Sequence, residues 1–111
     1  MVTPAAPPQE QTAQMLHEIG ISVHRHGYAQ LCIGIPRFAQ DSTQCLFKEL
    51  YPYIAKELNC TDCRAVERAI RSVISDGWQR RDPDVWGSYF PGSARPPSNK
   101  LFIATLAERL R

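Results

Sequence analysis

Three arginines in the second half of the chain have the type and spacing that nucleic-acid recognition needs. Arg64, Arg68 and Arg71 recur every three or four residues, so they would lie along one side of a helix, with Ser75 continuing that side and Glu67 beside it. The planar guanidinium matches both a phosphate and the O6/N7 edge of guanine. The pattern predicts a DNA-contacting helix face, but it is also typical of a solvated face in which Glu67 pairs with Arg71.

A second candidate site is the C-x-x-C motif formed by Cys60 and Cys63, with His24 and His26 upstream. Two thiolates and two imidazoles could hold zinc, and a thiol at a helix amino terminus could carry out redox chemistry because its pKa falls there. The sequence has no second C-x-x-C motif and no strand-helix alternation for a thioredoxin-like fold. We therefore expect four reduced, mostly buried thiols, no metal ligand and no cofactor.

No enzyme motif accompanies these residues. The sequence lacks a Gly-rich phosphate-binding loop, a G-x-S-x-G motif and an H-E-x-x-H motif. Its carboxylates occur singly on charged helix faces, so a catalytic pair has no support. We expect that the protein is not an enzyme.

Two apolar, helix-periodic segments on either side of a polar break would position the arginines. Ile54, Ala55 and Leu58 repeat before the break, which covers residues 59–62. The inward positions after it are Val66, Ala69, Ile70, Val73, Ile74 and Trp78. A short helix, a tight turn and a longer arginine-bearing helix indicate a helix-turn-helix with its recognition helix at about residues 63–79.

Two more helices are predicted upstream. The first lies within residues 9–21 and ends at Gly20, a residue type that often ends helices. The second begins near Gly27 or Tyr28. Pro36 should interrupt or end it, because a proline inside a helix removes a donor and clashes with the previous turn.

The remaining helices are predicted from caps and prolines. Asp41 or Ser42 could cap a third helix, with Pro52 either in its first turn or at a kink. The Asp82-Pro83 pair marks the start of a short helix over residues 83–89, and Ser98 or Asn99 caps the last helix. Inward positions in the third and last helices include Leu46, Phe47, Leu50, Leu101, Phe102, Leu106 and Leu110. No segment alternates as a strand would, so the predicted fold is all-α, with about six helices and no wing.

Length and composition agree with one small globular domain. The chain has 111 residues, of which 43% are hydrophobic and 22% are charged. This composition is ordinary for such a domain. The Pro- and Ala-rich residues 1–9 are predicted to be a disordered tail, and residues 10–111 the domain. A net charge of +2 permits nucleic-acid binding without requiring it. The absence of a membrane-spanning apolar run and of a signal pattern predicts a cytoplasmic location.

Specific stretches resemble the C-terminal effector domain of the stage zero sporulation protein A family, the response regulators that start endospore formation. LYPYIAK at residues 50–56, VERAIR at residues 66–71 and the following Trp78 carry the resemblance. IGISVHRHGYAQL at residues 19–31 is similar to the family's opening segment, and residues 95–111 look like its last helix. The resemblance covers roughly residues 10–111 and implies a helical DNA-binding domain without the family's receiver domain.

The resemblance also implies roles for individual residues. Glu67, Arg68 and Arg71 of VERAIR would lie in the major groove, and Lys48 matches a lysine suited to a phosphate contact. The segment before VERAIR is one residue longer than the family's. Ala65 therefore stands where the family has arginine, and Arg64 is displaced by about 100° around the helix. Ser72 replaces a histidine, so we expect a DNA site related to the family's but different from it.

Two functions of different classes follow. We expect a sequence-specific transcriptional regulator that binds double-stranded DNA, pairs head to tail on tandem sites and contacts the sigma subunit of RNA polymerase. The alternative is a protein-interaction module of the same fold that holds a regulator or RNA polymerase without binding specific DNA. Binding to a duplex library separates the two, since only the regulator should form a salt-sensitive, sequence-selective complex.

Overall fold

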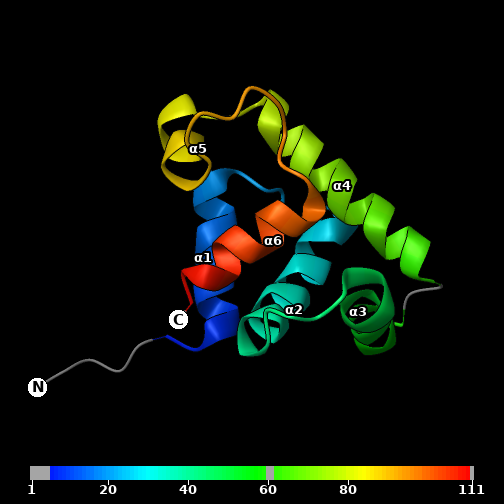
Figure 1. The fold of residues 1–111 in the computed structure, drawn as a ribbon. Helices are drawn as coiled ribbons and strands as arrows, with labels where there is room; N and C mark the ends of the chain where they lie inside the picture. The colour runs from blue at the N-terminus through cyan, green and yellow to red at the C-terminus, as the bar shows by residue number, and fades with distance from the viewer. Residues whose placement is uncertain (1–5, 60–61, 111) are drawn as a thin grey trace, which may run out of the picture.

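The computed structural model describes residues 6–59 and 62–110, and within them it contains six α-helices and no β-strand (Figure 1). This confirms the all-α prediction. The helices are α1 (Pro8–Ile19), α2 (His26–Gln40), α3 (Tyr51–Glu57), α4 (Cys63–Gln79), α5 (Pro83–Tyr89) and α6 (Asn99–Glu108), and a π-helical turn, η1 (Leu46–Leu50), precedes α3. None of the described helices is long and apolar enough to span a membrane.

The core is built around α2, which contacts α1, α3, α4 and α6. Leu31 and Ile35 of α2, Ile70 of α4, and Phe102 and Leu106 of α6 have no exposed surface and belong to one cluster. Because α4 buries its apolar side against this cluster, its other side must face solvent. The core thus fixes the orientation of the arginine-bearing helix.

Helix α1 begins at Pro8, inside the segment predicted to be a tail, while residues 1–5 lie outside the described residues. It ends as predicted at Gly20, whose φ of 97° lies in the left-handed region that glycine adopts without strain. The backbone N–H of Gly20 donates to the carbonyls of Leu16 and His17. This cap satisfies two of the helix's last carbonyls and turns the chain toward α2.

The prediction that Pro36 interrupts or ends the second helix was wrong. Helix α2 continues through Pro36 for four more residues, to Gln40. A proline removes one backbone hydrogen bond, but Ile35 and Phe38 on either side of it are buried in the core. Burial of these two side chains offsets the lost bond, because each fully buried large apolar side chain contributes about 1.5–3 kcal/mol.

Asp41 does not cap the third helix, as the sequence had suggested, and neither does Ser42. The Asp41 carboxylate instead accepts a hydrogen bond from the Thr43 backbone N–H at 3.0 Å, closing a turn at the end of α2. The chain becomes helical again only at Leu46. Serine and aspartate favour both caps and turns, and here the turn is formed.

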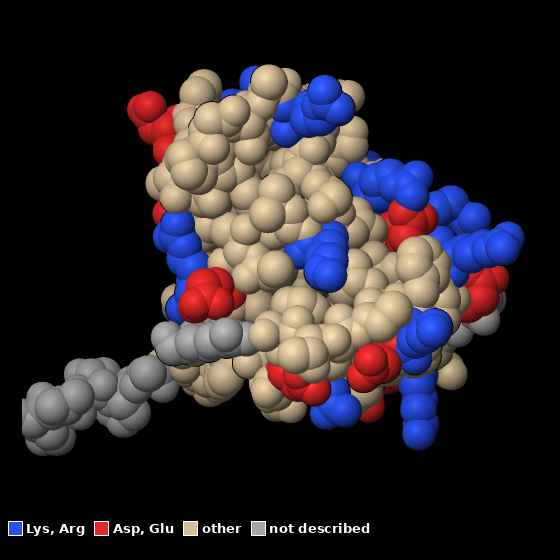
Figure 2. Space-filling model, in the orientation of Figure 1, with Lys and Arg blue, Asp and Glu red and all other residues tan. Residues whose placement is uncertain are grey.

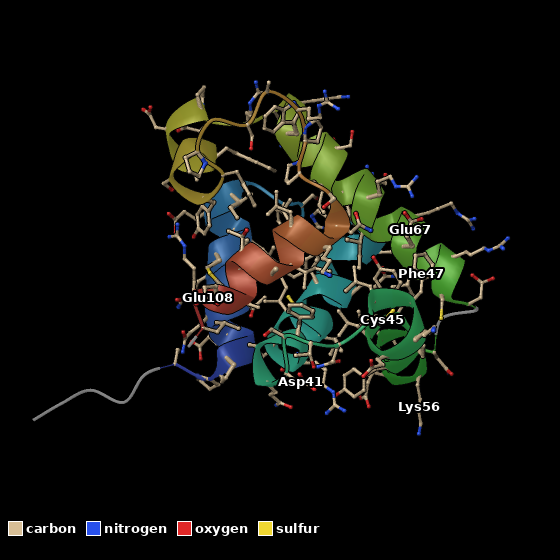
Figure 3. All side chains as sticks on the ribbon, in the orientation of Figure 1. Asp41, Cys45, Phe47, Lys56, Glu67 and Glu108 are labelled. Atoms are coloured by element: carbon tan, nitrogen blue, oxygen red, sulfur yellow. The ribbon has the colours of Figure 1, made fainter. Side chains whose placement is uncertain are left out.

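Helix α3 is preceded by a π-helical turn, in which the Leu50 N–H donates to the Cys45 carbonyl at 3.1 Å. Pro52 lies in the first turn of α3, directly after the π-helical turn, as one of the two sequence alternatives predicted. Two inward predictions fail: Phe47 on η1 is 52% exposed and Leu101 on α6 is 48% exposed. Figure 3 labels Phe47 and Cys45 close to each other at this turn.

Helix α4 has the predicted bounds. The Asp62 carboxylate accepts from the Ala65 N–H at 2.7 Å and caps its amino terminus. Val66, Ile70, Val73 and Ile74 are buried, and Trp78 is half-buried. These positions repeat at the helical period, so a single side of α4 forms its contact with the core.

The last two helices also begin at predicted caps. The Asp82 carboxylate accepts from the Asp84 N–H at 2.9 Å at the start of α5, and the Ser98 hydroxyl accepts from the Leu101 N–H at 3.1 Å at the start of α6. The Trp86 indole N–H donates to the Ile19 carbonyl at 3.0 Å. This buried bond ties α5 to the end of α1.

Candidate nucleic-acid interface

The outer side of α4 displays the arginines predicted from the sequence. Arg64, Arg68 and Arg71 are exposed, and Ser75 is half-buried. Figure 2 shows Lys and Arg side chains gathered along the edge of the molecule where α4 lies. Since the other side of α4 is packed into the core, these side chains can reach an external partner without unfolding any element.

Glu67 is more constrained than the sequence suggested. Its carboxylate accepts a hydrogen bond from Arg71, and the Glu67 side chain is 14% exposed against 69% for Arg71. The Glu67 backbone carbonyl also accepts from the Asn99 amide of α6 at 3.0 Å. The pairing of Glu67 with Arg71, expected for a solvated face, is therefore present, and the arginine is the more accessible partner.

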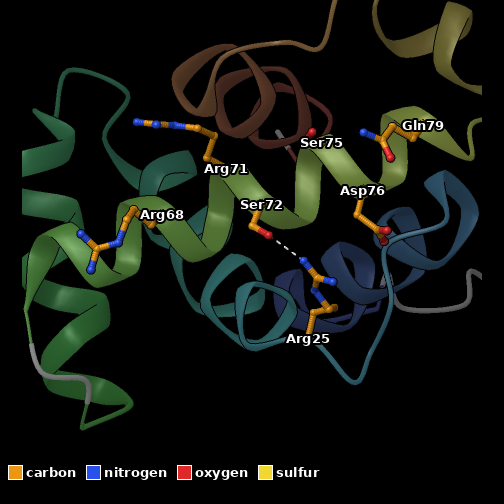
Figure 4. Close-up of a pocket in the computed structure, with 7 residues that line it drawn as sticks. All are labelled: Arg25, Arg68, Arg71, Ser72, Ser75, Asp76 and Gln79. Atoms are coloured by element: carbon orange, nitrogen blue, oxygen red, sulfur yellow. Dashed lines mark hydrogen bonds between the residues drawn. The ribbon is translucent and has the colours of Figure 1, made fainter.

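A shallow depression of about 420 Å³ lies on this side of α4 (Figure 4). It is lined by Arg25, Arg68, Arg71, Ser72, Ser75, Asp76 and Gln79. Of the predicted site residues, Arg68, Arg71 and Ser75 meet here. Arg64 and Glu67 lie on α4 outside the lining, and Lys48 is exposed on η1, a separate element.

Sequence reasoning missed Arg25, Asp76 and Gln79 on this surface, and Arg25 is the one that comes from outside α4. It precedes α2, and its Nη2 donates to the Ser72 hydroxyl at 2.6 Å, across 47 residues of sequence. The nearby Gly27 could have signalled that this connection lies close to another element, because glycine allows a close backbone approach. A Cβ on Gly27 would lie 2.6 Å from the Ala69 carbonyl oxygen of α4.

Asp76 brings a negative charge to the same depression. Its carboxylate accepts a hydrogen bond from Arg80 at 2.7 Å, and this bond, followed by the charges of Arg80 and Arg25, holds the pKa of Asp76 below its usual range. Arg80 also donates to the Gly20 carbonyl at 3.2 Å. Asp76 is thus ionised and paired with Arg80, while Arg25, Arg68 and Arg71 supply the positive charge that a ligand meets.

The C-x-x-C motif is not placed as a site. Cys60 lies outside the described residues, and His24 and His26 are exposed. Among the residues that are described, no group of three or more His, Cys, Asp or Glu side chains is arranged to hold a metal. Cys32 is buried and Cys63 half-buried, but Cys45 is exposed, which corrects the expectation of mostly buried thiols at that position.

A family model described as sporulation initiation factor Spo0A C terminal matches residues 12–110 of this chain. The match includes α2 to α6, most of α1, and every residue that lines the depression on α4. It covers the same stretches that carry the resemblance to sporulation regulators.

Proposed function

Since this chain belongs to the Spo0A C-terminal family of DNA-binding transcriptional effector domains, we propose that it reads DNA sequence with α4 in the major groove. The domain is regulatory and not an enzyme, and its family connects it with the control of sporulation.

The observation that carries the proposal is the division of α4 into two sides. Ile70 and Val73 have no exposed surface, whereas Arg68 and Arg71 project outward from the same 17-residue helix. Helix α3 packs against α4, as the first helix of a helix-turn-helix does against the second. A rigid helix with an exposed arginine side matches the docking geometry of a recognition helix.

Each predicted site residue takes a role in this arrangement. We assign Arg68 and Arg71 to guanine edges and Arg64 to a base edge or phosphate near the amino end of α4. Glu67 would orient Arg71 and accept a hydrogen bond from a cytosine amino group. A phosphate contact is assigned to Lys48, and Ser75 adds a short polar contact. Head-to-tail pairing on tandem sites and contact with a sigma subunit remain predictions.

Replacing Arg68 or Arg71 with alanine tests base readout. Selective binding to the preferred duplex should weaken by about 1–3 kcal/mol, and preference should relax at one base position, because a bidentate contact to guanine is lost. The preferred sequence is selected from a duplex library, and the dissociation constants are then measured by titration. Lys48→Ala should instead weaken all duplexes alike and lower the salt slope by about one.

Neither Arg68→Ala nor Arg71→Ala should unfold the domain, since both arginine side chains are exposed. Thermal melting of each variant checks this. If well-folded Arg68→Ala and Arg71→Ala variants bind every duplex as the parent does, α4 does not enter the groove. The protein-interaction module would then be the better account of the exposed surface.

A further inference from the structure

We propose that Arg25, in the connection between α1 and α2, binds a DNA backbone phosphate beside α4. This inference rests on the proposed function, because it places DNA over the same side of the recognition helix. It adds a contact from the connection between α1 and α2, which neither the spacing of the α4 arginines nor the Lys48 contact from η1 implies.

The position of Arg25 supports a role at the flank of the helix. Figure 4 shows Arg25 reaching α4 from below to meet Ser72, while Arg71 and Ser75 leave the opposite edge of the helix. A recognition helix in the major groove has a sugar-phosphate backbone on each side, and arginine side chains at the groove edges commonly contact it. Arg25 therefore lies at an edge where a groove-bound helix meets phosphate.

The hydrogen bond to Ser72 prepares Arg25 for this contact. A guanidinium has five N–H donors, and the bond to the Ser72 hydroxyl uses one of them. Because Arg25 Nη2 is already held 2.6 Å from the Ser72 hydroxyl oxygen, binding DNA would order this side chain at a smaller entropic cost than that of ordering a freely rotating arginine. Arg25 itself is exposed, so its guanidinium is accessible to a phosphate.

Charge around Arg25 agrees with the assignment. The nearby carboxylate, Asp76, hydrogen bonds to Arg80. With Asp76 paired in this way, Arg25 adds a positive charge to a depression that Arg68 and Arg71 already line. A ligand that approaches all three arginines is expected to be a polyanion, and a DNA backbone is one.

The experiment compares Arg25→Ala with Arg37→Ala. Arg37 is an exposed arginine near the far end of α2, over the Tyr53 ring, so it matches the change in charge without touching the depression. Binding to the selected duplex and to an unrelated duplex of equal length is measured between about 50 and 200 mM salt. Arg25→Ala should bind both duplexes roughly tenfold less tightly near 0.1 M salt, with a salt slope smaller by about one, because one phosphate contact is lost. The Arg37→Ala protein should bind as the parent does.

Two further variants separate the possible failures. Arg25→Lys keeps the charge and should retain the parent's salt slope; a slope as low as that of Arg25→Ala would overturn the phosphate assignment. Arg68→Ala reports on the proposed function. If it loses selectivity while Arg25→Ala matches the parent, the Arg25 inference is wrong and the α4 proposal stands. A parent protein that binds neither duplex overturns both.

Discussion

At the scale of single residues, Glu67 connects the DNA-facing surface to the interior. Its carboxylate pairs with Arg71, and its backbone carbonyl accepts from Asn99, whose amide also donates to the buried Tyr51 hydroxyl at 3.1 Å. The exposed arginine is therefore oriented by a residue whose backbone is fixed against α3 and α6. Such support is what a base-reading side chain needs to hold a defined geometry.

Glu67→Gln should separate general from selective DNA binding. The change keeps the side-chain shape but removes a negative charge, so affinity for an unrelated duplex should rise by roughly 2- to 10-fold. Selectivity should fall, because Arg71 loses its ion-pair partner and a cytosine amino group loses its carboxylate acceptor. The measurement is the ratio of dissociation constants for the selected and unrelated duplexes.

Glu18→Gln serves as the control for that change, since Glu18 is an exposed glutamate on α1, away from the depression. It removes the same charge and should leave the ratio of dissociation constants unaltered. Equal ratios for the two variants and the parent would mean that Glu67 acts only within the folded domain and has no part in base readout.

At the scale of the elements, the crossing of α2 and α4 determines where the recognition helix sits. Gly27 allows the two backbones to approach, because a Cβ there would lie 2.6 Å from the Ala69 carbonyl oxygen and 2.7 Å from Val73 Cγ1. The first of these atoms belongs to backbone and cannot rotate away. Any larger residue must push α4 outward or tilt it.

Gly27→Ala should destabilise the domain by about 1–3 kcal/mol through overpacking. It should also weaken DNA binding at temperatures where the variant is folded, because α4 is displaced from α2 and from Arg25. Chemical denaturation gives the stability change, and duplex titration gives the second effect. The matched control is Gly87→Ala in α5, where the added Cβ would meet no atom within 4 Å beyond its own chain neighbours and helix backbone.

Replacing Gly87 should leave DNA binding unchanged and stabilise the domain by up to about 1 kcal/mol, because alanine favours a helix more than glycine does. If Gly27→Ala behaved in the same way, the close approach of the two helices would not constrain α4. The contrast between two glycine substitutions isolates the crossing from the general effect of helix propensity.

The helices most accurately predicted from the sequence are those whose ends are marked by local chemistry. Asp62 and Ser98 each accept a bond from a backbone N–H three residues on, and such signals can be read within one turn. Pro36 misled the prediction because tertiary burial of its neighbours decides whether the helix continues. Arg25 was missed because its partner lies 47 residues away, and spacing within one helix carries no information about that contact.

At the scale of the whole molecule, one core unites the helices on which the arginine side of α4 depends. Buried side chains from all six helices, among them Leu16, Ile54 and Trp86, belong to a single cluster. The apolar periodicity of the sequence predicted most of this core. It did not predict the exposure of Phe47 and Leu101, because apolar residues also occur on the surfaces of folded proteins.

Several groups in or beside this core ionise only at high pH. Burial raises the pKa of the Cys32 thiol. Burial is also the largest cause of the raised pKa of the Tyr51 phenol, where it outweighs the hydrogen bond from Asn99, which lowers that pKa. Burial likewise raises the pKa of Tyr89. The folded protein therefore keeps protons at a pH where the unfolded chain has released them.

Stability should consequently fall as the solution becomes alkaline. Each of these groups contributes stability that is fully present below its unfolded pKa and is lost as pH rises through its folded pKa, because the native state binds more protons than the unfolded state there. The free energy of unfolding should decline from about pH 9 upward, where thiols and then phenols begin to ionise in unfolded chains.

Chemical denaturation at a series of pH values measures the decline. Cys32→Ala and Tyr51→Phe should each make it shallower, whatever their effect at pH 7, since each removes one titrating group. A decline as steep in both variants as in the parent would place its origin outside these two side chains.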